Sequence, residues 1–305
     1  MPRRLPQVPK GHAHYKGIKL NSVQVVGVHG IRQWDTNAHR LAEDWQSALT
    51  RGMSHHLGAA VTVPGLITPY YGDVFPKTKL LQLGQANEPA LDDLTDPDEI
   101  AFVTEMLHAY APDMELPEAE PTLGVPPRTP AWLTRWIAGL DGEWGQGVGE
   151  RTVTRIRELH GYLTNSEAAE RARQRIIDAF TGTAARLVIA HSLGSVIVYD
   201  MFHRDQIPSA GNGADGVNTL ITCGSPLGWL PLQRQLAIPG RLQLPGTVTW
   251  VNIFDPRDPV TAGQGLSDSA ATVTDTRVHN GGDPHSVRKY LRQEALARAV
   301  QTALA

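Results

Sequence analysis

Three polar residues in the second half of the chain have the types and the order needed for nucleophilic catalysis. Ser192 lies in RLVIAHSLGSVIVYD, Asp258 follows in NIFDPRDPV, and His285 follows in DPHSVRKYL. A serine hydroxyl is a poor nucleophile at neutral pH unless a neighbouring base takes its proton. A histidine can be that base, and an aspartate can hold its tautomer and stabilise the imidazolium. We therefore expect a triad of Ser192, Asp258 and His285.

The sequence around Ser192 predicts a sharp turn between a strand and a helix. Residues 187–190 form a short apolar run typical of a buried strand, and residues 196–199 continue with the spacing of a buried helix. A nucleophile at such a turn needs small residues two positions before and two positions after it, because the strand and the helix approach closely. Gly194 meets this demand, whereas Ala190 stands where glycine is more usual. Alone the motif is weakly specific; the Asp and His that follow in order make it more specific.

Backbone N–H groups beside Ser192 are candidates to stabilise a developing oxyanion. The first is the N–H of Leu193, at the start of the expected helix, and the second is the N–H of Ile31, in the turn after the first strand. Removing one such donor typically costs about 10²–10³ in rate. His29 is expected to shape the same turn, and His191 to form a wall beside the serine. The substrate-pocket candidates are His29, Gly30, His191, Ser225 and Pro226.

Alternatives exist for two members of the triad. Asp255 shares a turn with Asp258 and could be the acid in its place. His279, in RVHNGGDPHS, could replace His285 as the base, although its glycine-rich surroundings favour a flexible loop. Ser195 and Ser225 are typical of serines that hydrogen-bond the backbone of a turn.

The elements needed to position these residues alternate between strands and helices. Apolar, β-branched runs predict strands at 23–28, in 61–71, and at 187–190, 217–222 and 248–254. Helical periodicity predicts helices at 37–49, 166–180 with Ser166 as N-cap, about 193–202, and 286–304. This alternation predicts an α/β fold, with a mostly parallel central sheet wrapped by helices on both faces. The catalytic candidates then meet at the carboxyl ends of the strands.

The segment from about 76 to 165 differs in character from the rest of the chain. Prolines and acidic residues accumulate in it, and Trp132 and Trp136 lie in a helical stretch whose spacing favours packing over substrate binding. We interpret it as an insertion that forms a lid or cap. Residues 1–20 read as a polar N-terminal arm, and residues 21–305 as a single domain that carries the insertion.

Composition argues against several other functions. The net charge of −3 provides no electrostatic case for nucleic-acid binding. The single cysteine, Cys223, excludes an intrachain disulfide and a cysteine-based zinc site. His55 and His56 are adjacent and lack the spacing of a metal motif, and the chain holds no phosphate-binding loop and no dinucleotide fingerprint. We expect no metal and no cofactor.

No stretch of the sequence predicts export or membrane insertion. The N-terminal residues lack an apolar signal region, and no apolar run approaches 18 residues. We therefore expect a cytoplasmic protein without a transmembrane segment. Peripheral membrane contact through an exposed apolar face of the insertion stays open, as does the oligomeric state.

Five segments together resemble the α/β-hydrolase superfamily of lipases, esterases and related serine hydrolases. VVGVHGI resembles its first-strand His-Gly oxyanion turn, VIAHSLGSVIVYD its nucleophile turn, LITCGSPLG the Gly-Ser-Pro turn of lipase-like branches, NIFDPRDPV the acid turn, and DPHSVRKYL the histidine turn. The resemblance covers roughly residues 20–75 and 166–300. It favours Asp258 as the acid, because Pro259 and Val260 follow it, and it puts the insertion where this family often carries a lid.

The function implied by this resemblance is the cleavage of a carboxylic ester, of a small molecule or a lipid, through an acyl-enzyme intermediate. A thioesterase, an amidase or an acyltransferase would use the same machinery. A catalytically silent fold used for binding or interaction is the alternative from another class.

Overall fold

A computed structural model describes residues 22–30, 36–75, 94–111, 131–209, 216–236, 238 and 240–305. The expected N-terminal arm, Ile31 and parts of the 76–165 segment lie outside these residues.

The centre of the fold is a six-stranded parallel sheet with the strand order β2-β1-β3-β4-β5-β6. Its strands are β1 (Val23–Val28), β2 (Gly65–Ile67), β3 (Leu187–His191), β4 (Thr219–Cys223), β5 (Thr249–Phe254) and β6 (Thr274–Arg277). Because β1 lies between β2 and β3, the order reverses at β1. A crevice at the carboxyl ends of β1 and β3 is the usual ligand position in such sheets.

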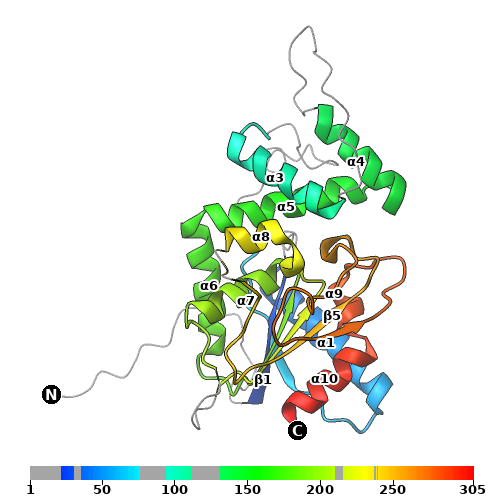
Figure 1. Cartoon of the computed structure of the whole chain (residues 1–305). Coiled ribbons are helices and arrows are strands. Elements are labelled where there is room, and N and C mark those ends of the chain that lie inside the picture. The colour runs from blue at the N-terminus through cyan, green and yellow to red at the C-terminus, as the bar shows by residue number, and fades with distance from the viewer. Residues whose placement is uncertain are drawn as a thin grey trace, which may run out of the picture.

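Helices cover both faces of the sheet (Figure 1). One face carries α1 (Ala38–Leu57), α9 (Val287–Tyr290) and α10 (Glu294–Leu304), and the other carries α6 (Ser166–Phe180) and α7 (Leu193–His203). The strands therefore need apolar side chains on both sides. In β3, Leu187 and Ile189 pack with the α1 and α10 residues, whereas Val188 and Ala190 pack with those of α6 and α7. The predicted α/β architecture is confirmed.

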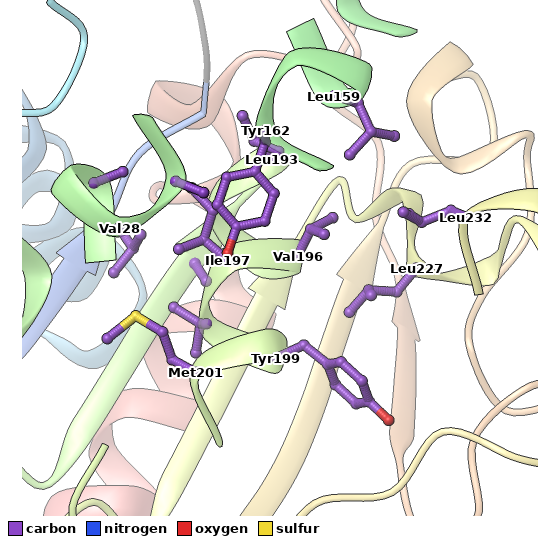
Figure 2. Packing of buried hydrophobic residues seen from close by; sticks show 14 of the residues in the cluster. Val28, Leu159, Tyr162, Leu193, Val196, Ile197, Tyr199, Met201, Leu227 and Leu232 are labelled. Carbon is purple, nitrogen blue, oxygen red and sulfur yellow. The ribbon is translucent and has the colours of Figure 1, made fainter. Parts of the chain in front are cut away.

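Three further helices lie beyond the carboxyl ends of the strands (Figure 1): α3 (Pro97–Tyr110), α4 (Ala131–Trp144) and α5 (Val148–Thr164). The described part of the 76–165 segment adds no strand to the sheet. Its apolar residues join the core cluster around α7, which includes Leu159 and Tyr162 of α5 together with Leu193 (Figure 2). Trp136 is buried in this cluster and Trp132 packs against it.

Short elements complete the turns after the strands. The 3-10 turn η4 (Pro226–Gly228) and helix α8 (Leu230–Gln235) follow β4, and the 3-10 turn η5 (Pro259–Thr261) follows β5. No helix of the described residues combines the length and the apolar character needed to cross a bilayer.

Several predicted elements differ from the observed ones. The second strand is only three residues long, because Pro64 precedes it and removes a backbone donor. Strand β6 was not predicted, because its residues TDTR are polar and partly exposed at the sheet edge. The predicted helix 286–304 is divided into α9 and α10 by the extended Gln293.

The helix ends also differ. The predicted helix 37–49 continues to Leu57, since Gly52 lets it pass close to the backbone of Leu291. The N-cap of α6 is Asn165 rather than Ser166: its side chain accepts a hydrogen bond from the N–H of Ala168.

Candidate active site

Five turns at the carboxyl ends of the strands converge on one place. They contribute Gly30 after β1, Ser192 after β3, Gly224 after β4, Asp258 after β5 and His285 after β6. These residues are up to 255 positions apart in the sequence. They come together because the carboxyl ends of parallel strands lie at the same edge of the sheet.

Ser192 occupies a sharp strand-to-helix turn. Its backbone has φ 55° and ψ −129°, a conformation that L-residues rarely adopt and that costs on the order of 1–3 kcal/mol. Its N–H donates to the carbonyl of Cys223 at 3.1 Å, which ties the turn to β4. At Gly194 a Cβ would overlap the carbonyl oxygens of Val28 and His29. Glycine is therefore required there, whereas the methyl group of Ala190 is fully buried in the core.

The turn after β1 approaches Ser192 closely. A Cβ on Gly30 would lie 2.8 Å from the Cβ of Ser192 and 3.3 Å from its Oγ. Only a residue without a side chain fits between the two turns. The backbone after β1 therefore passes directly beside the serine hydroxyl.

Asp258 and His285 form a buried pair. The Nδ1 of His285 lies 2.9 and 2.8 Å from the two carboxylate oxygens of Asp258, whose side chain is fully buried. A carboxylate can only accept, so Nδ1 carries the proton and Nε2 is the basic nitrogen. Gly224, with φ 55°, covers the pair: a Cβ there would lie 2.7 Å from Oδ2 of Asp258.

Tyr290 is a further part of the site that sequence reasoning missed. Its hydroxyl donates to Oδ2 of Asp258 at 2.8 Å and accepts the N–H of Asp255 at 3.0 Å. The N–H of Val260 donates to the other oxygen of Asp258 at 2.9 Å. These bonds fix the plane of the carboxylate. Tyr290 lies in the segment predicted as an unbroken helix, so its sequence position gave no signal.

The protonation states suit a base and its carboxylate partner. Burial lowers the pKa of His285; the Asp258 carboxylate acts in the opposite direction, and the positive charge of Arg155 adds to the lowering. Burial alone would raise the pKa of Asp258, but the charge of His285 and the hydrogen bonds from His285 and Tyr290 lower it. At neutral pH the imidazole is therefore neutral and the carboxylate ionised.

The two alternative residues face elsewhere. Asp255 is fully buried, but its oxygens accept the N–H of Arg257 at 2.9 Å and the N–H of Asn280 at 2.5 Å. It thereby fixes the loop between β6 and His285. The ring of His279 is 3.0 Å from the guanidinium of Arg257. The side chains of both residues are thus engaged elsewhere, and Asp255 meets Asp258 through the backbone, where its carbonyl accepts the N–H of Asp258 at 2.8 Å.

The other two predicted histidines are held by the backbone. His29 has Nδ1 2.5 Å from the carbonyl of Gly30, its Nε2 accepts the N–H of Tyr71 at 3.2 Å, and its ring stacks on Tyr71. Burial lowers its pKa to about 4. Nε2 of His191 is 2.9 Å from the carbonyl of His285, and burial lowers the pKa of His191 as well. Both histidines are therefore neutral supports of the turns.

Ser195 and Ser225 form an internal pair beneath the site. The hydroxyl of Ser195 donates to the carbonyl of Ser192 at 2.6 Å and lies 2.7 Å from the hydroxyl of Ser225. Ser225 also accepts the N–H of Leu227 and caps η4. Ser225 lines neither of the cavities described next.

Two cavities meet at Ser192. A polar cleft of about 330 Å³ is lined by His29, Gly30, His191 and His285, among others. A small apolar pocket of about 30 Å³ lies under the helices beyond the sheet and is lined by Met106 of α3, by Ile156 and Leu159 of α5, and by Leu193, Pro226 and Trp229. Ser192 and Arg155 line both. A substrate bound across the serine would thus have one polar and one apolar environment.

A backbone donor follows the serine directly. As the first residue of α7, Leu193 has an N–H without an intrahelical acceptor. Ile31, the other predicted donor, lies outside the described residues. No hydrogen bond joins Ser192 Oγ to His285 within the part of the chain that the structure describes, and such bonds often tighten only when substrate binds.

Comparison with family models, with curated proteins and with solved structures found no match for this chain. Among the described residues there is no group of three His, Cys, Asp or Glu side chains able to hold a metal ion.

Proposed function

We propose that this chain is a serine hydrolase of the α/β-hydrolase kind that cleaves a carboxylic ester through an acyl-enzyme intermediate. One observation carries the proposal: Ser192, in a strained turn, opens into the same cleft as His285, whose Nδ1 is bound to the buried Asp258. A fold without catalysis has no need for a strained serine beside an oriented, neutral imidazole.

The proposed reaction has two steps, each with a balanced proton transfer. As Ser192 Oγ attacks the ester carbon, its proton passes to Nε2 of His285, and the oxyanion faces the Leu193 N–H. The C–O bond to the alcohol then breaks, and His285 returns the proton to the leaving oxygen. In the second step a water gives its proton to Nε2 of His285 and attacks the acyl carbon. The bond from that carbon to Ser192 Oγ then breaks, His285 returns the proton to Oγ, and the acid is released.

The carboxylate of Asp258 acts through His285. It keeps the proton on Nδ1 and stabilises the imidazolium formed in each step. Tyr290 and Val260 hold this carboxylate in place. We further propose that α3, α4 and α5 act as a lid over the serine, because residues of α3 and α5 line the apolar pocket.

Two alternatives use the same residues differently. Thioester or amide cleavage, or acyl transfer to an acceptor other than water, needs the same triad. A silent binding module would keep the fold without an activated serine.

Covalent labelling tests the proposal. The purified protein is treated with a fluorophosphonate, and the adduct is mapped by mass spectrometry. We expect one adduct, on Ser192, that is absent in Ser192→Ala and strongly reduced in His285→Ala. Ser195→Ala is the matched control, because this serine lies one turn away but points into the interior. A folded protein that stays unlabelled, with and without detergent, would rule out the hydrolase proposal.

A further inference from the structure

One cation faces the serine from the helices beyond the sheet. Arg155 lies on α5 and lines both the polar cleft and the apolar pocket, as Ser192 does. Thr152, Ile156 and Leu159 also line the apolar pocket. The spacing 152, 155, 156 and 159 places these residues on one face of the helix, the face turned toward the strand ends. Figure 1 shows α5 lying over this end of the sheet.

Electrostatic effects on the triad agree with this placement. The positive charge of Arg155 contributes to the lowered pKa of His285 and to the lowered pKa of Asp258, after the larger effects of burial and of their mutual pairing. It also contributes to the lowering at His191. The charge therefore influences the site residues, and the lining of both cavities by Arg155 puts it where a substrate bound across the serine would lie.

The other charged residues that line the polar cleft do not line the apolar pocket. Arg288 forms an ion pair with Asp44 at the outer part of the cleft. Asp283 also lines the cleft and is exposed. Arg155 is the lining cation that is shared with the apolar pocket, where Ser192 and Leu193 also lie.

The size of the apolar pocket limits what can accompany the charge. At about 30 Å³ the apolar pocket is about a tenth the size of the polar cleft. We therefore assign the smaller, acyl part of the ester to it. The cleft of about 330 Å³ is then left for the alcohol part of the ester.

We propose that Arg155 binds an acidic group, a carboxylate or a phosphate, on the alcohol part of a short-chain acyl ester. The guanidinium is planar, remains charged and presents paired donors that match either anion. This inference rests on the proposed hydrolase function and assigns its substrate class. Arg155 is then a specificity-determining residue that touches the substrate away from the bond that breaks.

Matched acetate esters test the assignment. The probes are 3-acetoxybenzoate, 3-acetoxyphenyl phosphate and the neutral methyl 3-acetoxybenzoate. For each variant, kcat/KM for each anionic ester is divided by that for the neutral ester, so intrinsic differences in ester reactivity cancel between variants. In Arg155→Met we expect both ratios to fall by about tenfold or more, mainly through KM, because a charge-assisted hydrogen bond is lost. Arg155→Lys should retain part of the preference.

Arg151→Met is the control, since Arg151 is an exposed cation one turn earlier on the same helix and lines neither cavity. We expect its ratios to equal those of the wild-type protein. A fall for only one anionic ester identifies carboxylate or phosphate as the recognised group. Unchanged ratios for both in a folded Arg155→Met protein would overturn the inference.

A binding measurement separates this inference from the proposed function. In Ser192→Ala, calorimetry compares the affinities of 3-acetoxybenzoate and its methyl ester, with and without Arg155→Met. A preference for the anion that disappears with Arg155→Met supports the site even if the protein turns over no ester. Labelling of Ser192 together with equal affinities in all variants would reject the site and retain the hydrolase.

Discussion

Replacing Asp258 by Asn separates the two candidate acids most sharply. In the structure Oδ1 of Asp258 accepts the N–H of Val260 at 2.9 Å, and Oδ2 lies 2.8 Å from Nδ1 of His285. The side-chain oxygen of the asparagine would continue to accept the N–H of Val260, because the amide nitrogen cannot accept a hydrogen bond. The amide nitrogen would then face His285 Nδ1 as a donor.

The size of the effect follows from the tautomer. Facing a donor, Nδ1 of His285 must accept, so its proton moves to Nε2 and the ring no longer takes a proton from Ser192. Such an exchange lowers kcat by about 10⁴ in triads of this kind, which corresponds to about 5 kcal/mol of transition-state free energy. The fold should persist, since the side chains have the same shape.

Asp255→Asn is the matched control in the same turn. The carboxylate of Asp255 accepts two backbone N–H groups, and Asp255 meets Asp258 through the backbone, where its carbonyl accepts the N–H of Asp258. Its neutralisation should cost about 1–3 kcal/mol of unfolding free energy, as expected for weakened hydrogen bonds to a buried charge. Activity at a temperature where both proteins are folded should fall less than tenfold.

The assay is kcat/KM for 4-nitrophenyl acetate, with urea unfolding measured in parallel. In the wild-type protein the acid limb of the pH profile should lie below pH 6.5, because burial lowers the pKa of His285. If Asp258→Asn keeps activity within tenfold of wild type, or Asp255→Asn loses as much as Asp258→Asn, the assignment of the acid is wrong.

Two further predictions concern residues that support the site. Tyr290→Phe removes the hydroxyl that donates to Asp258 and accepts the buried N–H of Asp255. We expect the free energy of unfolding in urea to fall by about 1–3 kcal/mol and kcat to fall several-fold. Wild-type stability and kcat would contradict the assigned contacts. The pKa of His29 is about 4 against 6.5 when unfolded, so the folded state binds fewer protons between these values. His29 should therefore leave the free energy of unfolding unchanged above pH 6.5 and lower it by about 3 kcal/mol as the pH drops to 4. Urea titrations over this pH range should show a shallower fall in His29→Gln than in the wild-type protein. An identical fall in both would refute the lowered pKa of His29.

The local sequence pattern was sufficient to predict the interior strands of the sheet and the turn at Ser192. Buried parallel strands need apolar residues on both sides, and this leaves continuous runs such as VQVVGV and LVIA in the sequence. The glycine two positions after Ser192 was readable because the close approach of α7 to β1 admits no side chain. The polar edge strand β6 has no apolar run in the sequence, since a strand at the sheet edge buries few apolar side chains.

Chain order and residue type by themselves determined the candidates Ser192, Asp258 and His285 and the parallel α/β sheet that positions them. Only the tertiary structure shows that the carboxylate of Asp258 meets His285 while that of Asp255 meets Asn280, because the two residues lie in one turn and differ in the distant groups they contact. It alone revealed Tyr290 and Arg155 at the site. Their roles depend on contacts between segments far apart in the chain, and these exist only after the helices have packed against the ends of the strands.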